Sequence, residues 1–538
     1  MTAKLDYLKD LGIDAIWLSP HFPSPQFDVG YDISDYEDVA PEYGTLTDFQ
    51  RFLDGAHQRG LRVILDLVLN HTSHLHSWFL ESRSSRNPSA KRDWYIWRSG
   101  VNGGPPNNWL SPFGGPAWEY DAVTDQYYYH YFLKEQPDLN WRNPKVKKTM
   151  WEVVRFWLDM GVDGYRLDAI GTIFEDPAMP DHEGELTDEL RRKLNHGFPS
   201  GVDPEVTAAW QTIYRHQQGQ PGVHELMQEL RQVVDEYPDR VLVGESAEIS
   251  YYGDGRNELH LVFNFPLMRT NRLTPAWIRA NQRDRLSQLP PGAWPCNTLN
   301  NHDATRVLSR YGDGEHNDAI ARTSLALMLT LRGTPFLYNG EEIGMSDYFL
   351  NDISLFVDPP SIMYYHQEVA NGMPPQEALA RATRDTRDRS RTPFQWDATS
   401  NAGFSPEGVR TWLPVNPNYA EGINIADQES DPKSMLRFYK DLLRLRKQNP
   451  ALISGKYEPL HEASNDYLAF LRESDSPGQT CLVVLNLSDQ THRLKYDLPF
   501  STARCIFSNH KSTNESFSLE DLEMIPFEIL IAELHSAA

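Results

Sequence analysis

Short apolar runs alternate with amphipathic helical stretches along most of the chain. The run "IDAIWLSP" follows a helical stretch that ends at Gly12, and "LRVILDLVLNH" follows another that ends at Gly60. Five similar runs come later, at residues 164–170, 240–246, 259–265, 297–303 and 334–342. Because strands that alternate with helices are typical of parallel sheets, the pattern predicts an α/β fold with seven parallel strands.

Most of these predicted strands end in polar side chains. An open doubly wound sheet collects its ligand contacts at one switch point, whereas a barrel brings every strand end to one face. We therefore predict a (β/α)8 TIM barrel. That fold needs eight strands, so we expect its first strand to be missing from this chain. The polar strand ends are Ser19, Asn70, His71, Asp168, Glu245, Asn301, His302, Asp303, Glu341 and Glu342.

Two regions depart from the alternation. Residues 71–141 are rich in Gly, Pro, Trp and Tyr and are too long for a loop, which predicts an inserted subdomain after strand 3. From residue 457 onwards, short alternating runs predict a C-terminal antiparallel β domain over 457–538. The barrel then occupies 1–70, with strands 2 and 3, and 142–456, with loop insertions at 174–222 and 345–430.

Composition excludes some classes of partner. Lys and Arg number 51 and Asp and Glu 75, so the net charge of −24 disfavours nucleic acid and anionic membranes. The three cysteines form no CxxC pair and favour a reducing compartment. No apolar run approaches the roughly 20 residues that span a bilayer. We expect a cytoplasmic protein, and its oligomeric state stays open.

The candidate chemistry lies at three of the strand ends. Asp168, Glu245 and Asp303 each follow a different strand, and Arg166 shares a strand face with Asp168 because side chains alternate with a period of two. A single acidic residue at a strand end is more often a helix cap. Paired carboxylates, however, are what glycoside cleavage requires. A metal site built on His71 and His302 is the weaker alternative, since no HxxxH, HxH or nearby Cys accompanies them.

Four segments carry a resemblance to a known family. "LVLNH", "GYRLDAI", "VGES" and "NNHDATR", in this order, resemble the signature regions of glycoside hydrolase family 13, the α-amylase family. "GYDISDY", "QPDLNW" and "RTPFQWD" resemble its α-glucosidase or oligo-1,6-glucosidase branch. The resemblance covers nearly the whole chain.

The resemblance implies a role for each matching residue. Asp168 would be the nucleophile, Glu245 the acid/base, and Asp303 would hold the 2- and 3-hydroxyls of the sugar ring. Arg166 would lower the pKa of Asp168 and aim its carboxylate. The remaining matches would bind the sugar: His71 and His302 through hydroxyls, Tyr31 by stacking, and Asp28 and Arg391 at the non-reducing end.

The chain also departs from the family pattern. Members begin with a first barrel strand and a metal-binding loop, and this stretch is absent before "KLDYLKDLGIDAIWLSP". We therefore expect no metal and no other cofactor.

The resemblance implies a retaining, exo-acting α-glucosidase that takes short oligosaccharides such as maltose. In that branch, valine after the nucleophile accompanies α-1,6 cleavage, and threonine or a smaller residue accompanies α-1,4 cleavage, so Ala169 favours α-1,4 links. Two alternatives within the enzyme class are a trehalose- or sucrose-acting isomerase and a transglucosidase. The alternative outside the enzyme class is an inactive relative, either an N-terminally truncated chain or a protein similar to the heavy chains of amino-acid transporters.

Overall fold

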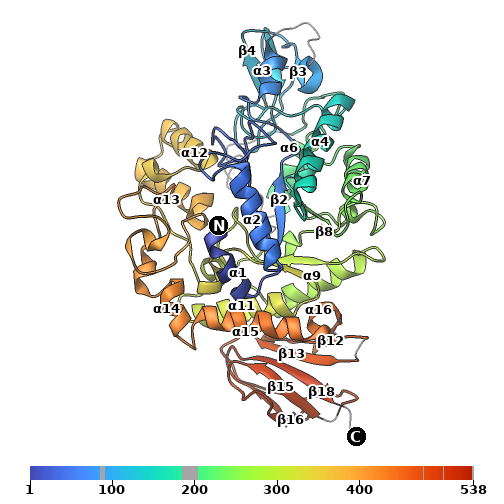
Figure 1. The fold of residues 1–538 in the computed structure, drawn as a ribbon, viewed down its shortest axis with the longest axis vertical. Coiled ribbons are helices and arrows are strands. Elements are labelled where there is room, and N and C mark those ends of the chain that lie inside the picture. Colours follow the sequence, from blue (N-terminus) through green and yellow to red (C-terminus); the bar gives the residue numbers. More distant parts are fainter. Residues whose placement is uncertain (85–90, 185–203, 476–477, 501, 536–538) are drawn as a thin grey trace.

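The computed structural model describes residues 1–84, 91–184, 204–475, 478–500 and 502–535. Its centre is a barrel of parallel strands (Figure 1). β1, β2, β6, β7 and β8 form one continuous sheet, and β9 pairs with β10. A parallel bridge between Phe263 and Cys296 joins the two groups. In the described residues no ladder links β10 to β1. The strands are β1 (Ala15–Leu18), β2 (Arg62–Leu67), β6 (Gly164–Leu167), β7 (Val241–Gly244), β8 (Leu261–Val262), β9 (Cys296–Thr298) and β10 (Thr334–Phe336).

All seven predicted strands are present and run in chain order, so the predicted barrel architecture is confirmed. Each strand is shorter than the apolar run that predicted it, because the polar ends leave the ladder and enter loops. Helices surround the barrel (Figure 1). They include α1 (Leu5–Leu11), α2 (Leu46–Gln58), α4 (Pro144–Met160), α7 (Val223–Val234), α8 (Phe265–Met268), α9 (Pro275–Gln288), α10 (Val307–Tyr311) and α11 (Asn317–Thr330).

Local sequence signals begin and end the long helices. Thr45 and Asp48 form a reciprocal capping box at the start of α2. Asn143 caps α4, Pro144 occupies its first turn, and Gly161 ends it in the left-handed conformation with φ 109°. This C-terminal glycine turns the chain directly into β6, the strand that carries Arg166.

Residues after β2 form a separate layer at the top of Figure 1. Its three-stranded antiparallel sheet has the order β3-β5-β4 and packs beside α3. An apolar cluster rich in aromatic rings joins this layer to α6 (Pro204–Tyr214). The elements of the layer are α3 (Ser77–Arg83), β3 (Trp97–Arg98), β4 (Trp118–Asp121) and β5 (Gln126–Tyr129). Residues 185–203 of the expected insertion at 174–222 lie outside the described residues.

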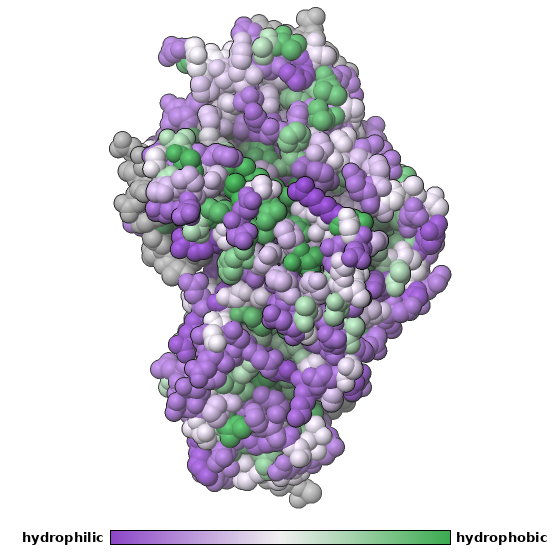
Figure 2. All heavy atoms as spheres, turned by 90° about the vertical axis from the view of Figure 1, so that its left-hand side faces the viewer, coloured by the Kyte–Doolittle hydropathy of each residue, from purple (hydrophilic) through white to green (hydrophobic). Residues whose placement is uncertain are grey.

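The stretch expected as an insertion at 345–430 contains α12 (Pro359–Ala370), α13 (Pro375–Asp385) and α14 (Ile425–Ser430). α12 and α13 pack on each other, and a small apolar cluster lies beneath them. Figure 2 views the molecule from this side, where apolar residues gather in the middle third and the lower part is mostly hydrophilic.

The C-terminal part is an antiparallel β domain, as predicted (Figure 1). Its six-stranded sheet packs against α11 and α15 through one shared apolar core. The elements are α15 (Met435–Gln448), α16 (Pro450–Ser454), β11 (Lys456–Leu460), β12 (Tyr467–Glu473), β13 (Thr480–Asn486), β14 (His492–Leu494), β15 (Thr502–Ser508), β16 (Ser516–Ser518), β17 (Leu522–Met524) and β18 (Ile529–His535). Across the described ranges, none of the helices has both the length and the apolar character of a membrane span.

Candidate active site

The end of β6 carries a buried arginine between carboxylates. Arg166 is fully buried, and its Nη1 donates to Asp168 Oδ1 at 2.7 Å. The same nitrogen donates to Asp66 Oδ1 at 2.9 Å. Asp66 and Arg166 are register partners on β2 and β6, so their side chains share a face of the sheet. As expected, Arg166 and Asp168 point to the same side.

Glu245 follows β7, the next strand, and contacts the same guanidinium. Its Oε2 lies 2.6 Å from Arg166 Nη2 and accepts the backbone N–H of Ala169 at 3.0 Å. One guanidinium therefore holds two carboxyl groups from neighbouring strands side by side.

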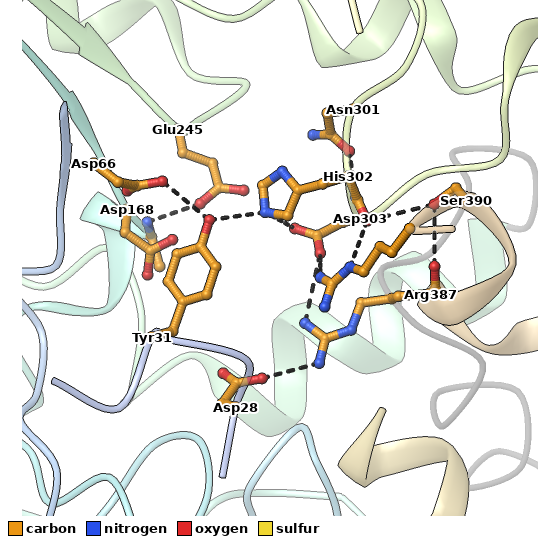
Figure 3. A network of polar contacts seen from close by, with 12 residues as sticks. Asp28, Tyr31, Asp66, Asp168, Glu245, Asn301, His302, Asp303, Arg387 and Ser390 are labelled. Carbon is orange, nitrogen blue, oxygen red and sulfur yellow. Dashed lines mark hydrogen bonds and ion pairs between the residues drawn. The ribbon is translucent and has the colours of Figure 1, made fainter. Parts of the chain in front are cut away.

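Asp303 follows β9 and faces two further arginines (Figure 3). Arg391 Nη2 donates to Asp303 Oδ1, and Arg391 Nε donates to the carbonyl of His302 at 2.7 Å. Arg387 Nη1 lies 3.5 Å from the same carboxylate oxygen. Asp303 is thus surrounded by positive charge.

Two rings lie between the carboxylates of Asp168 and Asp303 (Figure 3). Tyr31 and His302 are nearly parallel, with ring planes 5° apart and centroids 5.7 Å apart. The Tyr31 hydroxyl lies 2.8 Å from His302 Nε2 and donates to Asp66 Oδ2 at 3.0 Å. These contacts fix the ring of Tyr31 from both sides.

Asp28 contacts a different arginine from the one that the family pattern suggests. Arg387 Nη2 donates to Asp28 at 3.0 Å and also pairs with Asp358 at 2.7 Å, whereas Arg391 contacts Asp303. Gln136 donates to Asp28 Oδ2 at 3.1 Å and lies 3.0 Å from His71 Nε2.

The two carboxyls on Arg166 differ in proton affinity. Burial raises the pKa of Glu245 to about 8, and the charges of Asp168 and Asp303 add to this rise. Burial also raises the pKa of Asp168, to about 6, although Arg166 opposes it. Arg166 lowers the pKa of Asp168, as expected, but desolvation outweighs the neighbouring cation, so the net shift is upward. Near neutral pH, Asp168 is mainly ionised and Glu245 mainly protonated.

Asp303 shows the opposite balance. Burial would raise its pKa, but the guanidinium groups of Arg391 and Arg387 outweigh burial and hold the pKa well below the usual range. Burial lowers the pKa of His302 and of His71 to about 3. Both imidazoles are therefore neutral at physiological pH, and their ring nitrogens can hydrogen-bond to uncharged hydroxyl groups.

These side chains border a cavity of about 1610 Å³ at the carboxyl ends of the strands. Six of the nine residues singled out in the sequence line it, and the other three contact those six: Arg166 and Arg391 through carboxylates, and His302 through Tyr31. The six are Asp28, Tyr31, His71, Asp168, Glu245 and Asp303.

Four residues of the network escaped the sequence analysis: Asp66, Gln136, Asp358 and Arg387. Only Asp66 leaves a clear signal, since it is a lone carboxylate inside the apolar strand "RVILDL". Arg387 lies four residues before Arg391 in an Arg-rich stretch, so the sequence does not distinguish which of the two reaches Asp28.

Among the described residues, no three His, Cys, Asp or Glu side chains are grouped as a metal site. The site consists instead of an ionised carboxylate beside a protonated one, with neutral donors around a large cavity. A barrel with this pair at its strand ends defines an enzyme of the glycoside hydrolase class.

Comparison with known proteins agrees with this class. The family model "Alpha amylase, catalytic domain" matches residues 1–455. An oligo-1,6-glucosidase from Parageobacillus thermoglucosidasius is 38% identical over 554 residues, which cover 99% of this chain and 93% of that protein. An α-glucosidase from Pediococcus pentosaceus is 38% identical over 532 residues, covering 95% and 90%.

Solved structures extend the comparison. An isomaltulose synthase variant from Erwinia rhapontici NX5, in complex with its natural substrate sucrose, is 36% identical with a TM-score of 0.85. A trehalulose synthase from Pseudomonas mesoacidophila MX-45 is 37% identical with a TM-score of 0.86. Each match covers 99% of this chain and 94% of the other. The chain belongs to the α-amylase family and is a glycoside hydrolase.

Proposed function

We propose that this enzyme is a retaining, exo-acting α-glucosidase that releases terminal α-1,4-linked glucose from maltose and short oligosaccharides. The observation that carries the proposal is the pair of carboxyls on Arg166, of which Asp168 holds its proton less tightly than Glu245. Asp168 attacks the anomeric carbon while Glu245 protonates the departing oxygen. Glu245 then removes a proton from the water that releases glucose.

The closeness of the two carboxyls supports retention. An inverting enzyme needs roughly 6.5–9.5 Å between them to admit a water molecule, whereas a retaining one needs roughly 5–5.5 Å. Asp168 and Glu245 follow adjacent strands, and both carboxyl groups lie within 2.7 Å of one guanidinium, which favours the shorter arrangement.

The ion pairs around Arg387 support exo action. Arg387 pairs with Asp28, Asp303 and Asp358. In Figure 3, Arg387, Asp28 and Asp303 lie on the side of the site away from Glu245, so ion pairs occupy that side. In our proposal, Asp303, His302 and His71 bind the hydroxyls of a single terminal glucose. Tyr31 stacks on its ring, and Asp28 with its partner Arg387 binds its non-reducing end.

The linkage preference is the finer part of the proposal. Ala169 follows Asp168, adopts φ 39° and lines the cavity, so its methyl group leaves room beside the nucleophile. Similar proteins carry the names oligo-1,6-glucosidase and α-glucosidase, and the solved structures include sucrose-converting synthases. Because these proteins differ in linkage and in reaction, analysis of the products from maltose, isomaltose and sucrose is the decisive experiment.

We expect maltose to be cleaved with a higher kcat/KM than isomaltose, and glucose to appear first as the α-anomer. Proton NMR during the first turnovers of an aryl α-glucoside, whose leaving group is not a sugar, distinguishes the anomers of the released glucose before mutarotation. β-Glucose as the first product would exclude the retaining mechanism. Conversion of sucrose mainly to an isomeric disaccharide would instead identify an isomerase.

The two pKa values predict a bell-shaped pH profile. Asp168 acts when ionised, and its pKa is raised to about 6, so activity falls as the pH drops through 6. Glu245 acts when protonated, and its pKa is raised to about 8, so activity falls as the pH rises through 8. Measurement of kcat/KM for maltose between pH 4 and 10 checks both limbs. Undiminished activity at pH 4 would contradict the raised pKa of Asp168.

A further inference from the structure

The cavity also has a cationic wall. Arg269 directly follows α8, Arg310 lies in α10, and Arg389 precedes the Ser390–Arg391 segment; all three line the cavity. We call these three residues the basic lobe. It is unusual in a chain whose net charge is −24.

The basic lobe is continuous. Arg310 Nη1 donates to the carbonyl of Met268 at 2.7 Å, which fixes the backbone next to Arg269. Arg389 pairs with Asp347, whose backbone N–H donates to Ser309 Oγ at 2.8 Å, directly next to Arg310. The three guanidinium groups therefore belong to one part of the wall.

The positive charge of the basic lobe is only partly compensated. Arg389 pairs with Asp347 at 3.1 Å. In the described part of the chain, neither Arg269 nor Arg310 forms an ion pair with a carboxylate. Burial lowers the pKa of Arg269, and no acidic neighbour opposes this. A half-buried cation without a counter-ion is unfavourable, and an anionic ligand would relieve that cost.

The acidic residues of the same cavity do not neutralise the basic lobe. Glu368 and Glu377 pair with Arg381 on α13. The charge of Asp385 acts on Arg389, but Asp385 and Glu248 are both exposed, so water and salt screen these two carboxylates.

The basic lobe lies near the proposed acid. β7, which leads to Glu245, and β8, which leads to α8 and Arg269, are adjacent strands. The loop after β8 therefore lies next to the residue that protonates the departing group. The cavity of about 1610 Å³ also exceeds the roughly 300–1,000 Å³ of common ligand pockets, so it has room for glucose and a sizeable leaving group.

We propose that the basic lobe binds a carboxylate or phosphate on the leaving-group part of the α-glucoside. The inference rests on the proposed α-glucosidase activity and adds a preference, among its substrates, for glucosides whose leaving group carries an acidic group. Guanidinium groups suit this role because they donate paired hydrogen bonds to planar carboxylates and to phosphates.

Two substrates of equal length test the proposal. Maltobionate and maltitol both carry an α-1,4-linked glucose on an open six-carbon chain, and they differ in a carboxylate against a CH2OH group. We expect kcat/KM to be at least about tenfold higher for maltobionate, which corresponds to 1.4 kcal/mol. The preference should shrink with added salt, because part of the basic lobe is accessible to solvent.

Arg269→Gln should reduce the preference for maltobionate, and Arg269→Lys should retain part of it. Arg272→Gln is the matched control, since Arg272 lies three residues further on, is exposed and does not line the cavity. It should keep the wild-type preference. An equal loss in both glutamine variants would mean that net charge, and not the basic lobe, attracts the substrate.

Three outcomes separate the hypotheses. Equal kcat/KM for maltobionate and maltitol would overturn the basic-lobe proposal while leaving the α-glucosidase intact. If the wild-type enzyme did not cleave maltose, the proposed function would be contradicted. The basic lobe could then still be tested by calorimetry, through the Kd values of maltobionate and maltitol for the Asp168→Asn protein. If maltitol incubated with inorganic phosphate released glucose 1-phosphate, the basic lobe would bind the phosphate that attacks the glucosyl group. That result would refute our proposal that the basic lobe binds the leaving group.

Discussion

Asp168→Asn is expected to lower kcat for maltose by about 10⁴-fold or more, because the amide cannot form the covalent intermediate. The folded structure should persist, since Asn has the same shape and Arg166 keeps Asp66 and Glu245 as partners. Steady-state kinetics and the thermal midpoint Tm measure the two effects separately.

A matched control lies at the other end of the same strand. Asp163 precedes β6 and pairs with Arg62 and His57. Asp163→Asn should lower Tm and leave kcat close to the wild-type value. With Asp168→Ala, added azide should restore turnover of an activated glucoside and give a β-configured glucosyl azide by direct displacement. If Asp168→Asn kept wild-type kcat, another residue would have to be the nucleophile.

Glu245→Gln should separate substrates by their leaving groups. A glutamine cannot donate the proton that the sugar oxygen of maltose requires, so kcat for maltose should fall by about 10²–10⁴-fold. An aryl α-glucoside with a good leaving group departs without that proton, and its first step should be affected much less. Burst and steady-state rates for both substrates make the comparison.

The same variant should lose the alkaline limb of the pH profile, because the group with the pKa of about 8 is gone. Glu229→Gln is a suitable control, since Glu229 pairs with Lys147 on the outer helices. Equal losses on maltose and the aryl glucoside would argue against Glu245 as the acid.

The sequence by itself determined the order of elements and the edge of the barrel where the chemistry lies. Apolar runs separated by helices define parallel strands, and parallel strands in a barrel bring their carboxyl ends to one face. Asp168, Glu245 and Asp303 could therefore be placed together although they are far apart in the chain. The contact between Arg166 and Asp168 could also be predicted, because side chains two residues apart on one strand point to the same face.

Only the tertiary structure decided which charges meet and which protonation state results. The contact between Asp66 and Arg166 depends on the register of β2 against β6. The choice of Arg387 over Arg391 as partner of Asp28 depends on how a distant loop folds over the cavity. The signs of the pKa shifts also follow from burial: desolvation dominates at Asp168, and a cluster of cations dominates at Asp303. Desolvation depends on every atom packed around a group, so no short sequence motif can specify it.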